Sequence, residues 1–208
     1  GGSALTVSNN IIVGDLSGSA SDCQGIDIDS GNATAYVWNN IIYDWVNGTN
    51  ANYGIQGSSG TGYVYNNTVY NCRVGYGQVA GTVYARNNIA QNCNDGFSGS
   101  FNAASDHNVS DAAGDAPNAS FAGGEAAVTF IDASADDFHL SHLDTGARDN
   151  GTDLSSAADL AFSTDIDRAE RPTGTGWDIG ADESSIALFR SVGPGSTSAL
   201  AGGWTGST

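Results

Sequence analysis

Val37-Trp-Asn-Asn-Ile-Ile42 is the stretch that decides the fold, because near-copies of it recur through the first half of the chain. A repeat of roughly 20 to 30 residues built from short β-type stretches is typical of a solenoid. Apolar alternation predicts a strand before each Asn pair, the pair predicts a turn, and a second strand follows. The other copies are Val7-Ser-Asn-Asn-Ile-Ile12, Val64-Tyr-Asn-Asn-Thr-Val69, Ala85-Arg-Asn-Asn-Ile-Ala90 and a fainter Asp106-His-Asn-Val109.

Each repeat also contains a third predicted strand, which begins with glycine. Three strands and their turns would close one three-sided coil, and stacked coils would pair in parallel about 4.8 Å apart. We therefore predict an all-β chain folded as a single parallel β-helix of about five to six coils. The glycine-led strands are Gly25-Ile-Asp-Ile28, Gly54-Ile-Gln56, Gly75-Tyr-Gly-Gln78 and Gly96-Phe-Ser-Gly99.

Stacking places equivalent residues of successive coils in ladders. One Asn of each pair should point into the turn and hydrogen-bond to its counterpart in the next coil, which satisfies buried amides. The predicted Asn ladder is Asn10, Asn40, Asn67 and Asn88. The predicted apolar ladders are Val7, Val37, Val64 and Ala85; Ile12, Ile42, Val69 and Ala90; and Ile26, Ile28, Ile55, Tyr76 and Phe97.

Two cysteines fall at the same position of adjacent repeats. Cys72 and Cys93 each lie six residues after the first Asn of their motif. The spacing of adjacent coils lies within the Cα separation that a disulfide requires, and it is equally compatible with two stacked thiols.

Composition restricts the partners. The chain has a formal net charge of −17 and a pI of about 4.1, and its only basic side chains besides histidine are six arginines. Such a surface disfavours nucleic acid and anionic membranes and attracts cations such as Ca²⁺, or suits a high-salt environment. No apolar run is long enough to span a bilayer, so we expect no direct membrane insertion. Without a starting Met or a signal-peptide core, the sequence also suggests a processed piece of a longer protein.

A series of short strings in the second half carries a family resemblance. Asp136-Asp-Phe-His-Leu-Ser141, Thr164-Asp-Ile-Asp167, Arg171-Pro172 and Trp177-Asp-Ile-Gly-Ala-Asp-Glu183 follow one another in this order. The series resembles the C-terminal region of secreted bacterial right-handed parallel β-helix proteins of the pectate-lyase-like superfold, where it precedes cell-surface anchors. One departure is His142-Leu-Asp-Thr-Gly146, where the family has a longer stretch with Pro. The resemblance implies a right-handed β-helix with an extracellular or cell-surface location, and it does not imply catalysis.

These patterns divide the chain into three parts. Residues 1–125 are the predicted coils, residues 126–183 a degenerate last coil with an irregular Asp-rich C-terminal cap, and residues 184–208 a linker or the start of a further module. The acidic residues of the cap are expected to be structural, and the alternative is a Ca²⁺ site formed by Asp165 and Asp167. His139 and His142 have a spacing that could hold a metal only if a third ligand converged on them.

Outward positions of three coils carry aromatic residues, which we call the aromatic wall. Such a surface can stabilise the sheet, contact a protein or stack against sugar rings. The wall consists of Tyr36, Trp38, Tyr63, Tyr65, Tyr84 and Arg86.

A second outward group is acidic. Asp27 and Asp29 alternate with buried isoleucines, and Arg73 is the cation nearest to that face. Carboxylates on a β-helix face can hold Ca²⁺ against an acidic sugar while a basic group removes a proton. Asp27, Asp29 and Arg73 therefore define the enzymatic alternative, a Ca²⁺-dependent polysaccharide lyase or hydrolase.

The function expected from the sequence is that of an extracellular structural or adhesive module. It would belong to a larger surface or filament-forming protein and bind copies of itself, other surface proteins or glycans through its side walls. No catalytic residue is assigned in this interpretation, and Ca²⁺ is the one cofactor considered. The alternatives are the polysaccharide-active enzyme and a non-catalytic carbohydrate-binding module.

Overall fold

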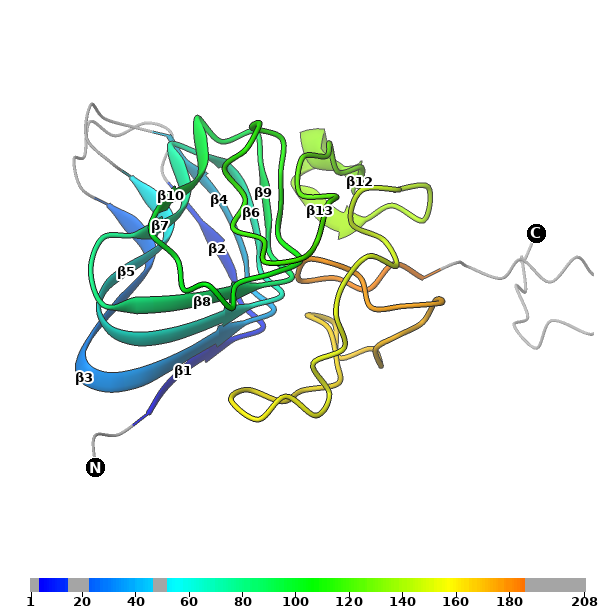
Figure 1. Cartoon of the computed structure of the whole chain (residues 1–208). Coiled ribbons are helices and arrows are strands. Elements are labelled where there is room, and N and C mark those ends of the chain that lie inside the picture. Colours follow the sequence, from blue (N-terminus) through cyan, green and yellow to red (C-terminus); the bar gives the residue numbers. More distant parts are fainter. Residues whose placement is uncertain (1–3, 15–22, 47–51, 186–208) are drawn as a thin grey trace, which may run out of the picture.

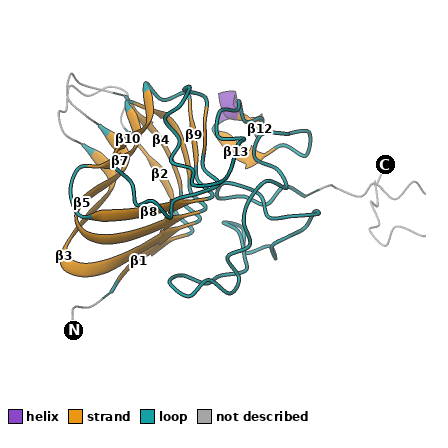
Figure 2. Cartoon of the chain, in the orientation of Figure 1, coloured by secondary structure: helices purple, strands orange, loops and turns teal. Residues whose placement is uncertain are grey.

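The described structure is all-β, and most of its strands pair in parallel (Figures 1 and 2). The computed structural model describes residues 4–14, 23–46 and 52–185. Nearly all of the predicted linker or further module, residues 184–208, therefore lies outside the described residues. None of the helical structure in the described ranges is long and apolar enough to cross a bilayer.

The first sheet has the order β1-β3-β5-β7-β10, and β8 also pairs with β5. All of these pairings are parallel. The strands are β1 (Leu5–Ser8), β3 (Gln24–Trp38), β5 (Tyr53–Tyr65), β7 (Val74–Gln78), β8 (Thr82–Arg86) and β10 (Asp95–Gly99).

The second sheet, also parallel, has the order β11-β9-β6-β4-β2. Each Asn pair links a strand of the first sheet to a strand of the second, so the pairs form the corner between the two sheets. We call one pass of the chain through both sheets a rung; the first to fifth rungs contain Asn10, Asn40, Asn67, Asn88 and Asn108. The strands of the second sheet are β2 (Ile11–Val13), β4 (Ile41–Trp45), β6 (Thr68–Cys72), β9 (Ile89–Gln91) and β11 (Val109–Ser110).

The sequence predicted that the glycine-led strand is a separate element in every rung, and this prediction is wrong for two rungs. In β3 and β5 it runs on into the strand that precedes the next Asn pair, so one long strand forms two sides of a rung. In the next rung β7 and β8 are separate, because the chain turns sharply where Val79 and Ala80 donate their N–H groups to the Gly57 carbonyl. Gly81 leaves this turn with a φ of +73°, a conformation that glycine adopts without strain.

The residues of each predicted apolar ladder pair with one another within one sheet, and their side chains fill the space between the two sheets. Val37 pairs with Val7 and Val64, Ile42 with Ile12 and Val69, and Ile55 with Ile26 and Tyr76. Together these ladders form the largest buried apolar cluster among the described residues.

The Asn corner contains two ladders with different tasks. The first Asn of each pair is in the left-handed region, with φ from 49° to 54° at Asn9, Asn39, Asn66 and Asn87. The second Asn points inward, and its Oδ1 accepts both the backbone N–H and Nδ2 of the second Asn of the preceding rung. This contact repeats at 2.9–3.1 Å through Asn10, Asn40, Asn67, Asn88 and Asn108. The predicted ladder members thus lie where the spacing places them, and Asn108 adds a fifth.

The cap prediction placed the C-terminal region over the end of the last rung, and the structure differs. That end is covered by residues 111–127, where Asn118 accepts from the Asn108 N–H and Asp115 accepts from the Gly96 N–H. The last strands are an antiparallel pair, β12 (Phe130–Asp132) and β13 (Asp137–Leu140), joined by the 3₁₀ turn η1 (Ala133–Ala135).

Residues 141–185 then run along the Asn corner, beside the rungs (Figure 1). Three of the left-handed asparagines hold this region. Nδ2 of Asn39, Asn66 and Asn87 donates to backbone carbonyls of Thr164, of Asp178 and Gly180, and of Thr152, at 2.7–3.0 Å. The corner therefore stacks the rungs with one Asn of each pair and binds the C-terminal region with the other.

Candidate functional site

The aromatic wall is partly covered by the chain itself. Tyr63 stacks between Tyr36 and Tyr84, at ring-centroid distances of 5.6 and 4.9 Å. Trp38 stacks on Phe162 of the C-terminal region at 6.2 Å. The wall and the C-terminal region share one apolar cluster that also contains Leu154, Leu160 and Trp177.

Tyr65 shows how complete this cover is at the centre of the wall. Its side chain has no exposed surface, and its hydroxyl donates to Asp159 Oδ2 at 2.7 Å. Burial and this hydrogen bond raise the pKa of Tyr65 well above its ordinary value. The prediction that the wall faces a partner or a glycan is therefore wrong for its centre, because apolar residues of the same chain already remove it from water.

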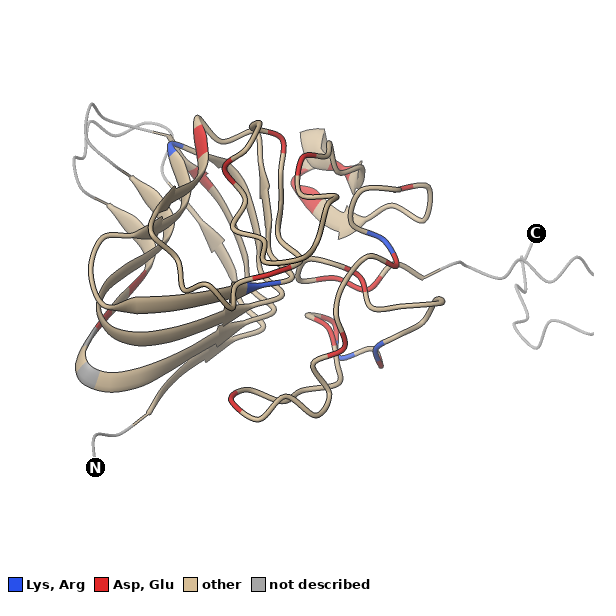
Figure 3. Cartoon of the chain, viewed as in Figure 1, with Lys and Arg blue, Asp and Glu red and all other residues tan. Residues whose placement is uncertain are grey.

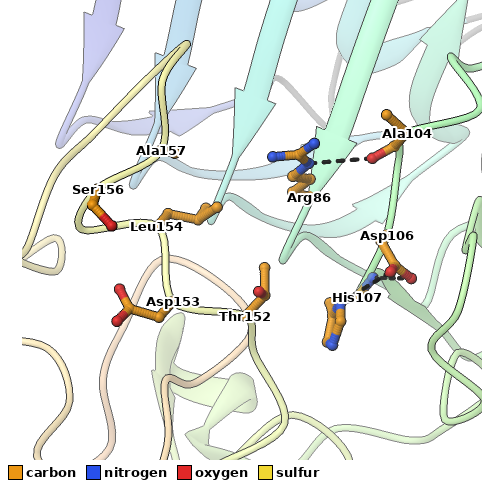
Figure 4. A pocket seen from close by; sticks show the side chains of 9 residues that line it. All are labelled: Arg86, Ala104, Asp106, His107, Thr152, Asp153, Leu154, Ser156 and Ala157. Atoms are coloured by element: carbon orange, nitrogen blue, oxygen red, sulfur yellow. Dashed lines mark hydrogen bonds and ion pairs between the residues drawn. The ribbon is translucent and has the colours of Figure 1, made fainter.

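The wall ends at a small pocket of about 300 Å³ (Figure 4). Arg86 lies 5.5 Å from the Tyr65 ring centroid and donates from Nε to the Ala104 carbonyl. Across the pocket, the Asp106 carboxylate accepts hydrogen bonds from Ser120 and from the N–H of Phe121. Burial opposes the charged form of Asp106, but these bonds outweigh it and lower its pKa to about 2. A carboxylate held in this way does not serve as a proton acceptor near neutral pH.

The residues of the enzymatic alternative do not converge. Asp27 and Asp29 are exposed on β3, and their carboxylates accept hydrogen bonds from Ser58 and Ser59. Asp27 is in register with Gln56 and Gly77, whereas Arg73 lies four residues before Gly77, so its Cα is about 16 Å from that of Asp27. A lyase site needs its base and its carboxylates around one sugar, and these three residues are too far apart.

Cys72 and Cys93 lie on adjacent rungs as free thiols. Cys72 is fully buried, and burial together with a hydrogen bond to Cys93 raises the pKa of its thiol. The pair therefore behaves as a small apolar part of the core.

Arg171 organises the C-terminal region from inside. Its side chain is fully buried, and Nη1 pairs with Glu183 Oε2 at 2.9 Å. Its two Nη atoms also donate to three backbone carbonyls, those of Asp178, Gly180 and Ala181. Burial raises the pKa of Glu183 to about 7. The Arg-Pro and Asp-Ile-Gly-Ala-Asp-Glu strings of the sequence thus meet in one internal network.

The predicted Ca²⁺ ligands have different surroundings. Asp165 is buried, and its two carboxylate oxygens accept from the N–H groups of Ala169 and Glu183. Asp167 is exposed and contacts His139 instead. Each oxygen of Asp165 thus already accepts one backbone N–H group, and Asp165 is not in the group of potential metal ligands that contains Asp167, so a Ca²⁺ site formed by the two residues stays a prediction.

A different group of metal-ligating side chains meets at this place. His139, Asp167 and Asp182 each offer one ligand atom, and these atoms lie within 4.8 Å of one another. They line a pocket of about 350 Å³ together with His142. The sequence interpretation considered His139 but missed Asp182, which lies 43 positions further along the chain.

Acidic residues are more frequent in the C-terminal region than in the rungs (Figure 3). Neither family models, nor curated proteins, nor solved structures gave a match to this chain. The resemblance to surface β-helix proteins in the C-terminal strings therefore remains an expectation, and the geometry of the chain itself carries the functional argument.

Proposed function

We propose that the chain is a right-handed parallel β-helix that serves as a structural module of a larger extracellular surface protein. In this proposal its first rung stacks on a further parallel coil of the same Asn-turn type. The parallel order of both sheets and their common register support the β-helix. The resemblance of the C-terminal strings supports the extracellular location.

The observation that carries the proposal is the open edge of the first rung. Among the described residues, β1 pairs only with β3, and β2 pairs only with β4. The same edge exposes three apolar side chains, Leu5 by 50%, Ile11 by 62% and Val13 by 54%. Unpaired backbone groups beside apolar side chains are the features of an edge that another strand can extend.

The direction of the Asn ladder selects the kind of partner. Each Oδ1 of the ladder accepts from the preceding rung, and Asn10 Oδ1 accepts nothing from the described residues. A parallel coil with its own Asn pair would supply the missing donors. A second copy approaching edge to edge would instead oppose two acceptors, and the opposite end of the rungs is covered by residues 111–127. The ladder therefore favours a parallel coil over a second copy.

The proposal moves the contact surface from the aromatic wall to the first rung. The centre of the wall is occupied by the C-terminal region, and Asp27, Asp29 and Arg73 are separated. A non-catalytic structural role fits these positions better than polysaccharide cleavage does.

A fused coil tests the proposal. A copy of residues 35–61 placed directly before Leu5 keeps the register, because Leu5 pairs with Ala35 and Ala35 pairs with Gly62. We expect amide exchange in β1 and β2 to slow to the level of β4. The free energy of unfolding in urea should rise by about 1–2 kcal/mol, since Leu5 faces the core and becomes buried, whereas Ile11 and Val13 face outward and gain only a neighbour on the added strand.

The matched control is the same fusion with Asn40→Leu in the copied coil only. It keeps the strands and the backbone N–H but removes the Nδ2 donor that Asn10 Oδ1 would accept. We expect it to protect β1 and β2 less than the unmodified fusion does. Unchanged exchange in β1 and β2 with the unmodified fusion would refute stacking, and equal protection by both fusions would refute the selection by the ladder.

A further inference from the structure

We infer that His139, Asp167 and Asp182 form a binding site for a divalent transition metal ion of the Zn²⁺ type. This inference does not depend on the proposed function. The three residues come from separate segments: β13, the turn at residues 164–170, and the end of the described C-terminal region. An ion bound to all three would join these segments.

The orientation of His139 is set for metal binding. Its Nδ1 lies 2.5 Å from Asp137 Oδ1, and its Nε2 lies 3.1 Å from Asp167 Oδ2. Asp137 therefore holds the proton on Nδ1 and directs Nε2 toward Asp167. A carboxylate that orients a histidine in this way is the usual outer partner of a metal-bound imidazole.

Asp182 supplies an independent indication of a ligand. Asp182 is only 7% exposed. Oδ2 accepts from the Leu140 N–H at 2.7 Å, while Oδ1 accepts no hydrogen bond from the described residues. Asp182 lines the pocket, so a cation in the pocket can reach the carboxylate of this otherwise buried residue and stabilise its charge. An ion between Asp182 and His139 would provide that cation.

The spacing of the ligand atoms fits a small ion. Zn²⁺ binds imidazole nitrogen and carboxylate oxygen at about 2.0 to 2.2 Å, which places neighbouring ligand atoms of a tetrahedron about 3.3 Å apart. The His139 to Asp167 distance of 3.1 Å already matches this value. All three ligand atoms lie within 4.8 Å of one another, so small side-chain rotations would close the site.

The chemistry of the ligands selects the ion. Ca²⁺ requires six to eight oxygen ligands, and one imidazole with two carboxylates does not supply them. Imidazole nitrogen favours Zn²⁺ and its transition-metal neighbours. Three protein ligands beside an open pocket leave a further coordination position for water, which is the arrangement of an open zinc site.

Zn²⁺ titration of the chelator-treated full chain tests the inference. We expect one Zn²⁺ per chain by calorimetry, retained in an excess of CaCl₂, and visible absorption bands of four-coordinate Co²⁺ when Co²⁺ replaces it. Asp137→Asn should weaken Zn²⁺ binding about 10- to 100-fold by releasing the orientation of His139. Asp167→Asn and Asp182→Asn should weaken it further, because each removes a charged ligand.

Asp136→Asn is the matched control, because Asp136 is exposed next to β13 and lies outside the group. Its Zn²⁺ affinity should equal that of the unmodified chain. Zn²⁺ should also raise the thermal midpoint of the unmodified chain and of Asp136→Asn, but not of Asp167→Asn. If Asp182→Asn fails to fold, the exposed Asp167 decides the question. Equal affinity in Asp167→Asn and Asp136→Asn, absence of binding, or displacement of Zn²⁺ by Ca²⁺ would overturn the site.

Discussion

Asn67→Ala is expected to destabilise the chain by about 4 kcal/mol or more, which is a large part of the roughly 5–15 kcal/mol that stabilises an ordinary domain. Asn67 is fully buried in the middle of the ladder. Its Oδ1 accepts from the N–H and Nδ2 of Asn40, and its Nδ2 donates to the carbonyls of Val37 and Tyr65. Alanine leaves these groups unpaired away from water, at about 1–3 kcal/mol each. Urea unfolding followed by circular dichroism measures the loss.

Asn10→Ala is the matched control for this prediction. Asn10 occupies the same position of the ladder in the first rung, but it is exposed, so water can replace its partners. We expect a loss of about 1 kcal/mol or less. Similar losses in the two variants would mean that the ladder contributes through the turn conformation and not through its buried hydrogen bonds.

Arg171→Met is expected to cost about 3–5 kcal/mol, because it leaves the buried Glu183 carboxylate without its charge partner. Three backbone carbonyls lose a donor at the same time. Arg171 also lies 5.6 Å from the ring centroid of Trp177, which is 2% exposed. Loosening of the C-terminal region should therefore shift tryptophan fluorescence to longer wavelength. Urea unfolding and the emission maximum test both parts of the prediction.

Two further variants separate charge pairing from packing. Adding Glu183→Gln to Arg171→Met should recover part of the loss, since no unpaired charge is then buried. Arg148→Met removes a partly exposed pair with Asp149 and should cost at most about 1 kcal/mol. If the double variant is no more stable than Arg171→Met alone, the unpaired carboxylate is not the cause of the loss.

The positions of the ladders could be predicted because the Asn-Asn sequence motif recurs in successive rungs. Any stacking that buries Val37 must also bury its counterparts Val7 and Val64, and it brings the Asn pairs to one corner. The continuous runs of β3 and β5 could not be predicted in the same way. Gly60 and Gly81 both have a positive φ, 70° and 73°. The strand β5 continues through Gly60, whereas the turn before Gly81 separates β7 from β8.

The cover of the aromatic wall was missed because parity assigns a side chain to the outer face without saying what lies against it. A signal did exist in the C-terminal half. Leu154, Leu160, Phe162 and Trp177 are apolar residues in a polar segment, and they need an apolar surface to pack against. The aromatic wall is the surface that they cover.

The same reasoning applies to the His139 group. The sequence offered His142 as the partner of His139 because the two lie three positions apart, and it gave no third ligand. Asp167 and Asp182 reach it only because the Arg171 network folds the C-terminal region back toward β13. Distances between residues that far apart in the chain are set by packing and not by local pattern.

By itself, the sequence determined that parallel strands stack in register around an asparagine corner, since a repeated local pattern must form the same contacts in every rung. Only the tertiary structure decided where residues 141–185 lie, and with them the cover of the wall and the meeting of His139, Asp167 and Asp182. The physical reason is that this region has no repeat. Its place follows from a few specific contacts, such as those of Asn66 and Arg171, whose partners no periodicity reveals.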